Sequence, residues 1–143
     1  YDASIGGIEY FSTLGNGRAE AYSAILAGSD TGTTPTSGQA VYLADYEVAV
    51  ISNLRYYETE LRGVSSLDDG KISIVADFDQ GTVTGSDGAL VVDGAITGRA
   101  FEGGVVYAGH DGDLEGLVGD QGVIGAFHGN NGQIVFAGGF VGN

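Results

Sequence analysis

The stretch GVIGAFHGNNGQIVFAGGFVG, residues 122–142, contains two copies of one short pattern. Both copies read G-x-F-x-G, at residues 125–129 and 138–142, and residues 98–103, GRAFEG, are a looser version. Side chains at alternate positions of a β-strand point to the same face. The first glycine and the phenylalanine of each copy therefore share a face, so a ring can lie over bare backbone across the sheet. The pattern predicts strands and assigns these residues to architecture rather than to binding.

Alternation of apolar residues continues on both sides of the repeat. In residues 71–79, for example, Ile72, Ile74, Ala76 and Phe78 occupy alternate positions. Such alternation is typical of half-buried antiparallel strands. Asp-Gly or Asn-Gly pairs at residues 69–70, 87–88, 111–112 and 131–132 are typical of tight turns. The expected strands lie near residues 19–27, 40–51, 71–79, 81–85, 89–98, 112–119, 122–128 and 133–141, with a ninth near 102–108.

Many short strands and little or no helix predict an all-β fold, either an up-and-down barrel or a sandwich. Glycines inside the strand patterns, such as Gly94, Gly116 and Gly125, favour a small antiparallel barrel of eight or nine strands, because glycine permits sharp coiling and close packing. Residues 1–17 are expected to be a leader or loop, and residues 18–143 a single barrel domain. Residues 28–38 and 63–70 are expected to be connections.

Residues 53–62, NLRYYETELR, do not fit the alternation. Leu54, Tyr57 and Leu61 have helical spacing, whereas Tyr56, Tyr57 and Thr59 favour a strand. Periodicity cannot decide between the two in so short a window. We favour a strand or an irregular excursion over a helix.

Composition excludes several classes of protein. The chain has 143 residues, 27 glycines, no cysteine and a net charge of −14, from 19 acidic and five basic side chains. The glycines have no collagen period, no apolar run is long enough for a transmembrane helix, and the charge would repel nucleic acid. Without cysteine there are no disulfides or thiolate metal sites. A chain that starts at Tyr1 and is acidic and lysine-poor is expected to be a mature extracytoplasmic protein, with a trimmed cytoplasmic domain as the alternative.

Three runs resemble one known family. GKISIVADFDQGTVTG (residues 70–85), GAITGRAF (residues 94–101) and the stretch from residue 122 to the end are similar to the barrel of the transferrin-binding protein B family. The resemblance implies an eight-stranded barrel in a bacterial surface or extracytoplasmic protein. It also implies a ligand such as a host iron carrier, haem, a haem protein or a complement regulator. Residues 39–69 depart from the family pattern, as do His128 and Val141, which stand where the family has tyrosine.

Tyrosines gather in the segment that departs from the family pattern. Tyr42 and Tyr46 are expected to fill the barrel, whereas Tyr56 and Tyr57 are candidate ligand-binding residues, because tyrosine is enriched in binding surfaces. We expect residues 39–66 and the flanking loops to form the end that faces a partner.

Histidine offers the other candidate site. His110 and His128 could each ligate haem, and the alternative is that both are solvated surface residues. No other cofactor is expected and no metal site is predicted, since residues 110–115, HDGDLE, do not match the calcium-loop pattern. No G-x-S-x-G motif, P-loop or dinucleotide fingerprint is present, so no catalytic residue is assigned and an enzyme is not expected.

These observations predict a non-catalytic, extracytoplasmic binding barrel that takes a protein or small-molecule ligand, in iron or haem acquisition or in host-protein binding. The first alternative is a structural subunit of a surface or multi-subunit assembly that packs against copies of itself. The second alternative is a secreted haem carrier that uses His110 or His128.

Overall fold

The computed structural model describes residues 4–13, 16–25, 31–57, 60–131 and 134–143, and every regular element in these ranges is a β-strand. The strands are β1 (Ser4–Thr13), β2 (Asn16–Ile25), β3 (Gln39–Tyr57), β4 (Glu60–Asp77), β5 (Thr82–Ser86), β6 (Leu90–Thr97), β7 (Ala100–Tyr107), β8 (His110–Gly119), β9 (Gly122–Asn131) and β10 (Ile134–Gly142).

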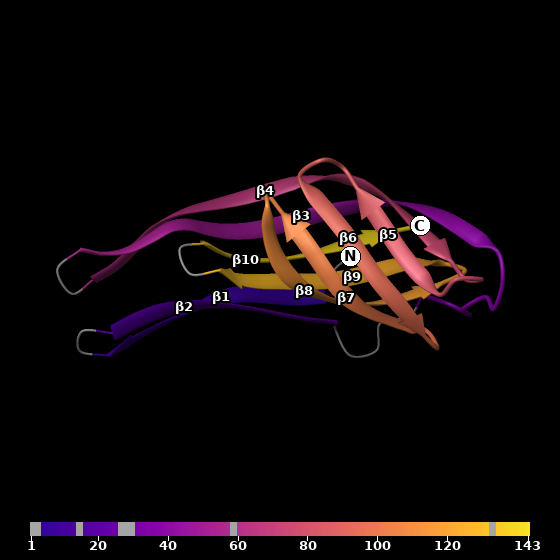
Figure 1. Ribbon diagram of the computed structural model, residues 1–143, viewed down its shortest axis with the longest axis horizontal. Coiled ribbons are helices and arrows are strands. Elements are labelled where there is room, and N and C mark those ends of the chain that lie inside the picture. The colour runs from indigo at the N-terminus through magenta and orange to yellow at the C-terminus, as the bar shows by residue number, and fades with distance from the viewer. Residues whose placement is uncertain (1–3, 14–15, 26–30, 58–59, 132–133) are drawn as a thin grey trace.

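Strands β3 to β10 form one closed barrel in the order β10-β3-β4-β5-β6-β7-β8-β9 (Figure 1). Every neighbouring pair is antiparallel, and each strand lies beside the next in sequence until β10 closes the barrel against β3. This confirms the predicted antiparallel up-and-down barrel of eight strands. The segment near residues 102–108, expected as a ninth strand, is β7 and belongs to the barrel.

The alternation along β3 shows how the barrel is filled. Its inward positions from residue 42 to residue 50 are all buried: Tyr42, Ala44, Tyr46, Val48 and Val50. Val41 and Leu43 lie on the outer face between them, 68% and 59% exposed. Tyr42 and Tyr46 therefore fill the barrel, as expected.

The three phenylalanines of the repeated pattern, and Phe136 between two of its copies, face glycines on the neighbouring strand. The cross-strand pairs are Phe101 with Gly116, Phe127 with Gly138, Phe136 with Gly129 and Phe140 with Gly125. A Cβ atom added at any of these glycines would overlap the facing ring or come within 2.8 Å of it. Each ring thus occupies the space that a side chain would need, which confirms that the pattern builds the barrel.

The same rings pack in series through the interior. Ring centroids are 6.5 Å apart for Phe101 and Phe140, 6.5 Å for Phe140 and Phe127, 6.3 Å for Phe127 and Phe136, and 5.7 Å for Phe136 and Tyr107. Phe101 and Tyr107 lie near opposite ends of β7. The aromatic series therefore runs from one end of the barrel to the other and leaves its interior filled with side chains.

One end of the barrel is fastened by the segment that precedes β3. Thr31 and Thr33 accept hydrogen bonds from the main-chain N–H groups of Gln121 and Asp120, both at 2.9 Å. Thr34 Oγ1 donates to the carbonyl of Val118 at 2.7 Å. Residues 31–38 contain no strand, as expected for this loop, and residues 28–30 lie outside the described part of the chain.

At the other end, β3 and β4 continue past the barrel as a two-stranded projection (Figure 1). The last pair between β10 and β3 is Val135 with Ile51, whereas β3 pairs with β4 out to Tyr57 and Glu60. We call residues 52–57 and 60–64 the arm. The strand favoured over a helix in residues 53–62 is confirmed for residues 53–57 and 60–62, and residues 58–59 lie outside the described part.

Two sequence predictions fail near the arm. Residues 63–70 are not a connection but part of β4, and the pair Asp69-Gly70 forms no turn. Pairing with β3 overrides the turn-like composition, and Gly70 serves a different purpose, since it lies opposite Tyr46 and leaves room for that ring.

The N-terminal prediction is also wrong for the described residues. Residues 4–13, expected within a leader or loop, form β1, and the predicted first barrel strand is β2, which pairs with β1 instead. These two strands form a separate two-stranded sheet.

Turn positions are partly as predicted. Gly88, with φ of 97°, lies in the expected turn between β5 and β6. Asp111-Gly112, by contrast, lies inside β8, because the turn is made by Ala108 and Gly109, whose φ values are 49° and 85°. The left-handed conformation of both residues suits a tight hairpin. The Asn131-Gly132 turn extends outside the described residues.

Replacing Gly125 by alanine tests the packing of ring on glycine. The new methyl group would overlap the Phe140 ring, so we expect the free energy of unfolding to fall by about 1–3 kcal/mol. Urea unfolding measures this value. The control is Gly104→Ala, whose Cβ would meet only the Gly112 carbonyl, at 3.4 Å. Equal stability of the two variants would contradict the account.

Candidate binding surface at the arm end of the barrel

Two buried tyrosines close the barrel at its arm end. Tyr107 Oη donates a hydrogen bond to Asp68 Oδ2 at 2.6 Å, and Tyr46 Oη donates to Asp87 Oδ2. Both tyrosine residues are only 6% exposed. The donors come from β3 and β7 and the acceptors from β4 and the β5–β6 turn, so these bonds tie four parts of the barrel end together.

Burial and the acidic partners raise the pKa of both phenols. Desolvation is the largest cause for Tyr46, followed by the hydrogen bond to Asp87, and together they raise its pKa to about 12. The same two causes, with Asp68 as the partner, raise the pKa of Tyr107 above its ordinary value. Both side chains are neutral hydrogen-bond donors at physiological pH, as a structural role requires.

Asp87 is held by the turn that it begins. Its Oδ1 accepts hydrogen bonds from the N–H groups of Ala89 at 3.0 Å and Leu90 at 2.7 Å. Burial acts to raise the pKa of this carboxyl, but the hydrogen bonds from Tyr46, Leu90 and Ala89 outweigh it and lower the pKa. The ionised carboxylate therefore draws the β5–β6 turn inward toward Tyr46.

Exposed apolar side chains lie at the start of β4. Leu67 is 68% exposed on the outer face, and Val64 is 57% exposed on the inner face, beyond the point where the barrel closes. The two side chains lie on opposite faces of β4, so they offer separate contacts and do not form one apolar patch.

The candidate residues Tyr56 and Tyr57 lie on the arm. They pair in register with Leu61 and Glu60 of β4. Between them and the barrel, β3 carries an extra residue, because Ser52 pairs with Val64 but Arg55 pairs with Arg62. A bulge of this kind bends and twists the strand. The side chains of both tyrosines lie outside what the structure describes.

The two histidines lie on opposite faces of the barrel wall. His128 is on the outer face of β9, where its Nε2 is 3.6 Å from Asp113 Oδ2 of β8. His110 is the first residue of β8 and has the parity of the inward residues of that strand, such as Leu114. The barrel thus does not bring the two imidazoles together, and haem ligation by either one stays a prediction.

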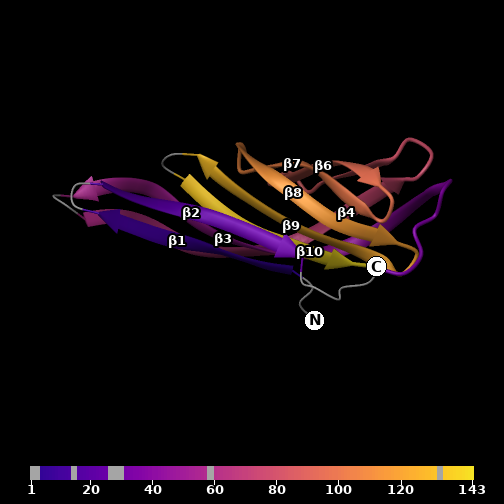
Figure 2. The same ribbon diagram turned by 90° about the horizontal axis from the view of Figure 1, so that it is seen from below.

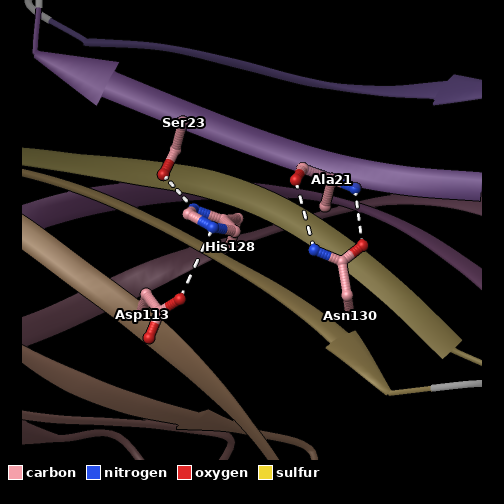
Figure 3. Close-up of polar contacts among 5 residues, drawn as sticks. All are labelled: Ala21, Ser23, Asp113, His128 and Asn130. Carbon is pink, nitrogen blue, oxygen red and sulfur yellow. Dashed lines mark hydrogen bonds and ion pairs between the residues drawn. The ribbon is translucent and has the colours of Figure 1, made fainter.

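His128 contacts the N-terminal hairpin instead (Figure 3). Its Nδ1 forms a hydrogen bond of 2.8 Å with Ser23 Oγ on β2. Asn130, two residues along β9, accepts from the N–H of Ala21 at 2.7 Å and donates to its carbonyl at 3.3 Å. Ala21 also packs with Ile51, Val135 and Ala137 of the barrel wall. The β1–β2 hairpin is therefore fastened along the outside of β9 and β10 (Figure 2).

Sequence reasoning missed this contact between hairpin and barrel. The one signal for it was that His128 stands where the resembling family has tyrosine. A polar outward side chain in that position now bonds to β2.

In the part of the chain that the structure describes, no group of three or more His, Asp or Glu residues is arranged to hold a metal ion. The acidic residues Asp111, Asp113 and Glu115 follow one another on the outer face of β8 rather than around a loop. No described helix could cross a membrane.

The Tyr46–Asp87 hydrogen bond predicts a change of stability at high pH. A phenol whose pKa rises from 10 unfolded to about 12 folded stabilises the fold fully below pH 10, and this contribution is lost as the pH rises toward 12. Tyr46→Phe should therefore flatten the fall in the urea midpoint between these two pH values. At pH 7 the variant should lose about 1.5–3 kcal/mol, the value of a hydrogen bond to a charged group. The control is Thr97→Ala, at an exposed position. An unchanged alkaline transition in Tyr46→Phe would contradict the assignment.

No protein-family model and no curated protein sequence matches the chain. Solved structures do match it. A surface lipoprotein has 15% sequence identity and a TM-score of 0.62, over 100% of this chain and 77% of that chain. A variant of transferrin-binding protein B from Actinobacillus pleuropneumoniae H49 has 14% identity and a TM-score of 0.59, over 96% of this chain and 76% of that one.

Intact transferrin-binding protein B, with N and C lobes, matches with 15% identity and a TM-score of 0.58, over 89% of this chain and 30% of that chain. At such identities the likeness is one of fold. The chain has the β-barrel fold of transferrin-binding protein B, as the resemblance of its glycine and phenylalanine pattern implied.

Proposed function

We propose that this chain is a non-catalytic, extracytoplasmic binding protein that takes a host protein, with an iron carrier as the first candidate. The observation that carries the proposal is the arm, which extends β3 and β4 beyond the closed barrel. The barrel fold shared with a surface lipoprotein and transferrin-binding protein B supports the location and the kind of partner.

The filled interior favours a protein over a small molecule. Phe101, Phe127, Phe136 and Phe140 are at most 2% exposed and stack along the barrel. An eight-stranded barrel is just wide enough for its side chains, and here they occupy it. A ligand must therefore bind outside the barrel, on its ends, its wall or the arm.

The perturbed side chains of the described residues support a non-catalytic reading. The tyrosines with a raised pKa, Tyr42, Tyr46 and Tyr107, each donate a hydrogen bond to a fixed acceptor. Asp87 is fastened to its own turn. Burial and these structural hydrogen bonds account for the shifted pKa values. None of the contacts places a nucleophile beside a general base.

In this proposal Tyr56 and Tyr57 supply the contact area. The backbone of both residues lies on the arm, beyond the last β10 pair and outside the closed barrel. Tyrosine combines a large apolar face with a polar tip, which suits a contact that must be stable in water when unbound.

In the haem-carrier alternative, His110 or His128 would be the only histidine ligand of the haem, because the two lie on opposite faces of the barrel wall. The assembly alternative requires copies of a chain with a net charge of −14 to associate, and their mutual repulsion opposes this. No structural feature supports either alternative as the arm supports binding of a protein.

Immobilised transferrin is the probe that tests the proposal. Replacing Tyr56 and Tyr57 together by alanine should raise the dissociation constant about thirtyfold or more, the effect of losing a hot spot of about 2 kcal/mol. Replacing both by phenylalanine keeps the rings and should lose less. Thr97→Ala, at the opposite end of the barrel, is the control. Failure of the wild-type chain to bind, or equal binding by the double alanine variant, would refute the proposal.

A further inference from the structure

The side of β4 that faces away from β3 has a strand partner over only part of its length. β5 pairs with β4 at Ile74, Val75, Ala76 and Asp77, whereas β3 pairs with β4 from Asp77 back to Glu60. Within the described residues, no strand pairs with this side of β4 over residues 60–73. We call residues 64–71 of this side the free edge.

The direction of the main-chain groups follows from the register. Phe78 N–H donates to the carbonyl of Gly38 at 2.8 Å, next to the pair Asp77 and Gln39. In an antiparallel ladder, bonded pairs alternate with non-bonded pairs, and the register is continuous as far as Val64. Even-numbered residues of β4 therefore bond to β3, and the odd-numbered ones present N–H and C=O groups at the free edge. These are Ser65, Leu67, Asp69 and Lys71.

Proline, bulges and charged side chains are the features that usually block strand addition. The free edge has no proline and no bulge, and two of its three charged side chains, Asp68 and Lys71, are paired within the chain. The only proline of the chain is Pro35, and the bulge next to the arm is on β3 rather than on β4. Lys71 Nζ bonds to Asp45 Oδ1 on β3 at 2.6 Å, so this lysine leans away from the edge.

The space beside the free edge is open because β5 ends early and the β5–β6 turn bends away from β4. β5 ends at Ser86, and Asp87 bonds to Tyr46, which stands opposite Gly70 on the inner face. The turn thus bends in over the barrel end instead of continuing along β4. An added strand would extend the line of β5.

The strand that adds here could come from a second copy of this chain or from another protein, and charge favours a basic segment of another protein. A second copy would bring another −14 charge to the contact, whereas a basic segment would meet Asp69 on the outer face. Asp68, on the inner face, is already held by Tyr107. Exposed Leu67 offers an apolar contact beside Asp69.

We propose that the free edge of β4 binds an extended, basic segment of a partner protein as an added β-strand. Main-chain hydrogen bonds to the odd-numbered residues hold the segment, an apolar side chain covers Leu67, and a lysine or arginine pairs with Asp69. This inference rests on the proposed function and specifies how the partner is bound.

The probe is a synthetic peptide of about seven residues, the length of an ordinary strand, with both ends blocked. Valine and lysine alternate at every second position, so that both lie on one face of the added strand, and threonine fills the positions between. Amide hydrogen exchange of the ¹⁵N-labelled full chain is followed by NMR with and without saturating peptide. Exchange at Leu67 and Asp69 should slow roughly tenfold or more. Exchange at Ser66 and Asp68, whose N–H groups already face β3, should stay nearly the same.

Two variants separate strand addition from other binding. Leu67→Pro removes one N–H from the free edge and should abolish protection, while Leu67→Ala keeps it and should bind with modest loss. Asp69→Lys should weaken binding at least tenfold. Its control is Glu115→Lys, which changes the net charge equally on exposed β8. If the two lysine variants weaken binding equally, the attraction is general and the proposal is wrong.

Other outcomes also decide the matter. Protection of the same amides in a peptide-free dimer seen by light scattering would show that the occupant is a second copy and overturn the proposal. Absence of peptide binding, or protection outside the free edge, would overturn it too.

If transferrin binds without protecting Leu67 and Asp69, the proposed function stands and this inference fails. If the peptide protects them but transferrin does not bind, the proposed function fails while the free edge keeps its role.

Discussion

Phe101, Phe127, Phe136 and Phe140 each lie against the bare backbone of a glycine on the adjacent strand, and this contact fixes the register of β7 with β8 and of β9 with β10. A slip of one residue would send every ring to the outer face and bring side chains into its place. The rings then pack on one another through the barrel, so the pairs that set the register also fill the core. Closure against β3 follows from the same strands, since β10 carries two of the four rings.

Because side chains fill the barrel, the residues that build the core are not available to bind a ligand. The interior has no room for a ligand, and the two barrel ends are fastened by different means. The loop before β3 bonds to the β8–β9 turn at one end, and the Tyr46 and Tyr107 hydroxyls bond to carboxylates at the other. Only the second end carries the arm and the free edge of β4. Polar contacts at this end thus support the surface that we propose for binding.

The parts of the fold that follow from local periodicity could be predicted from the sequence. The strand in residues 53–62 was also predicted, but the continuation of β4 through residues 63–70 and the projection of the arm beyond the barrel were not. The G-x-F-x-G copies predict strands from the sequence alone, because a glycine and a phenylalanine two residues apart lie on the same face of a strand. Asp69 and Gly70 look like a turn, yet they lie in β4, since both pair with β3 and Gly70 leaves room for the buried Tyr46 ring. The contact of Ser23 with His128 joins residues that are far apart in sequence, so no local signal shows it. Tyr56 and Tyr57 were found as candidates by residue type and by their departure from the family pattern, and the structure adds their place on the arm.

The central claim is that the barrel and the binding surface use different residues. Ser52 and Val64 form a bonded cross-strand pair at the base of the arm, so an Asn-Gly turn can replace residues 53–63 between them. The most direct measurement compares urea unfolding and transferrin binding of this shortened chain with those of the full chain. Our account predicts a free energy of unfolding within about 0.5 kcal/mol of the full chain and loss of transferrin binding. Unchanged affinity, or a shortened chain that no longer forms the barrel, would contradict it.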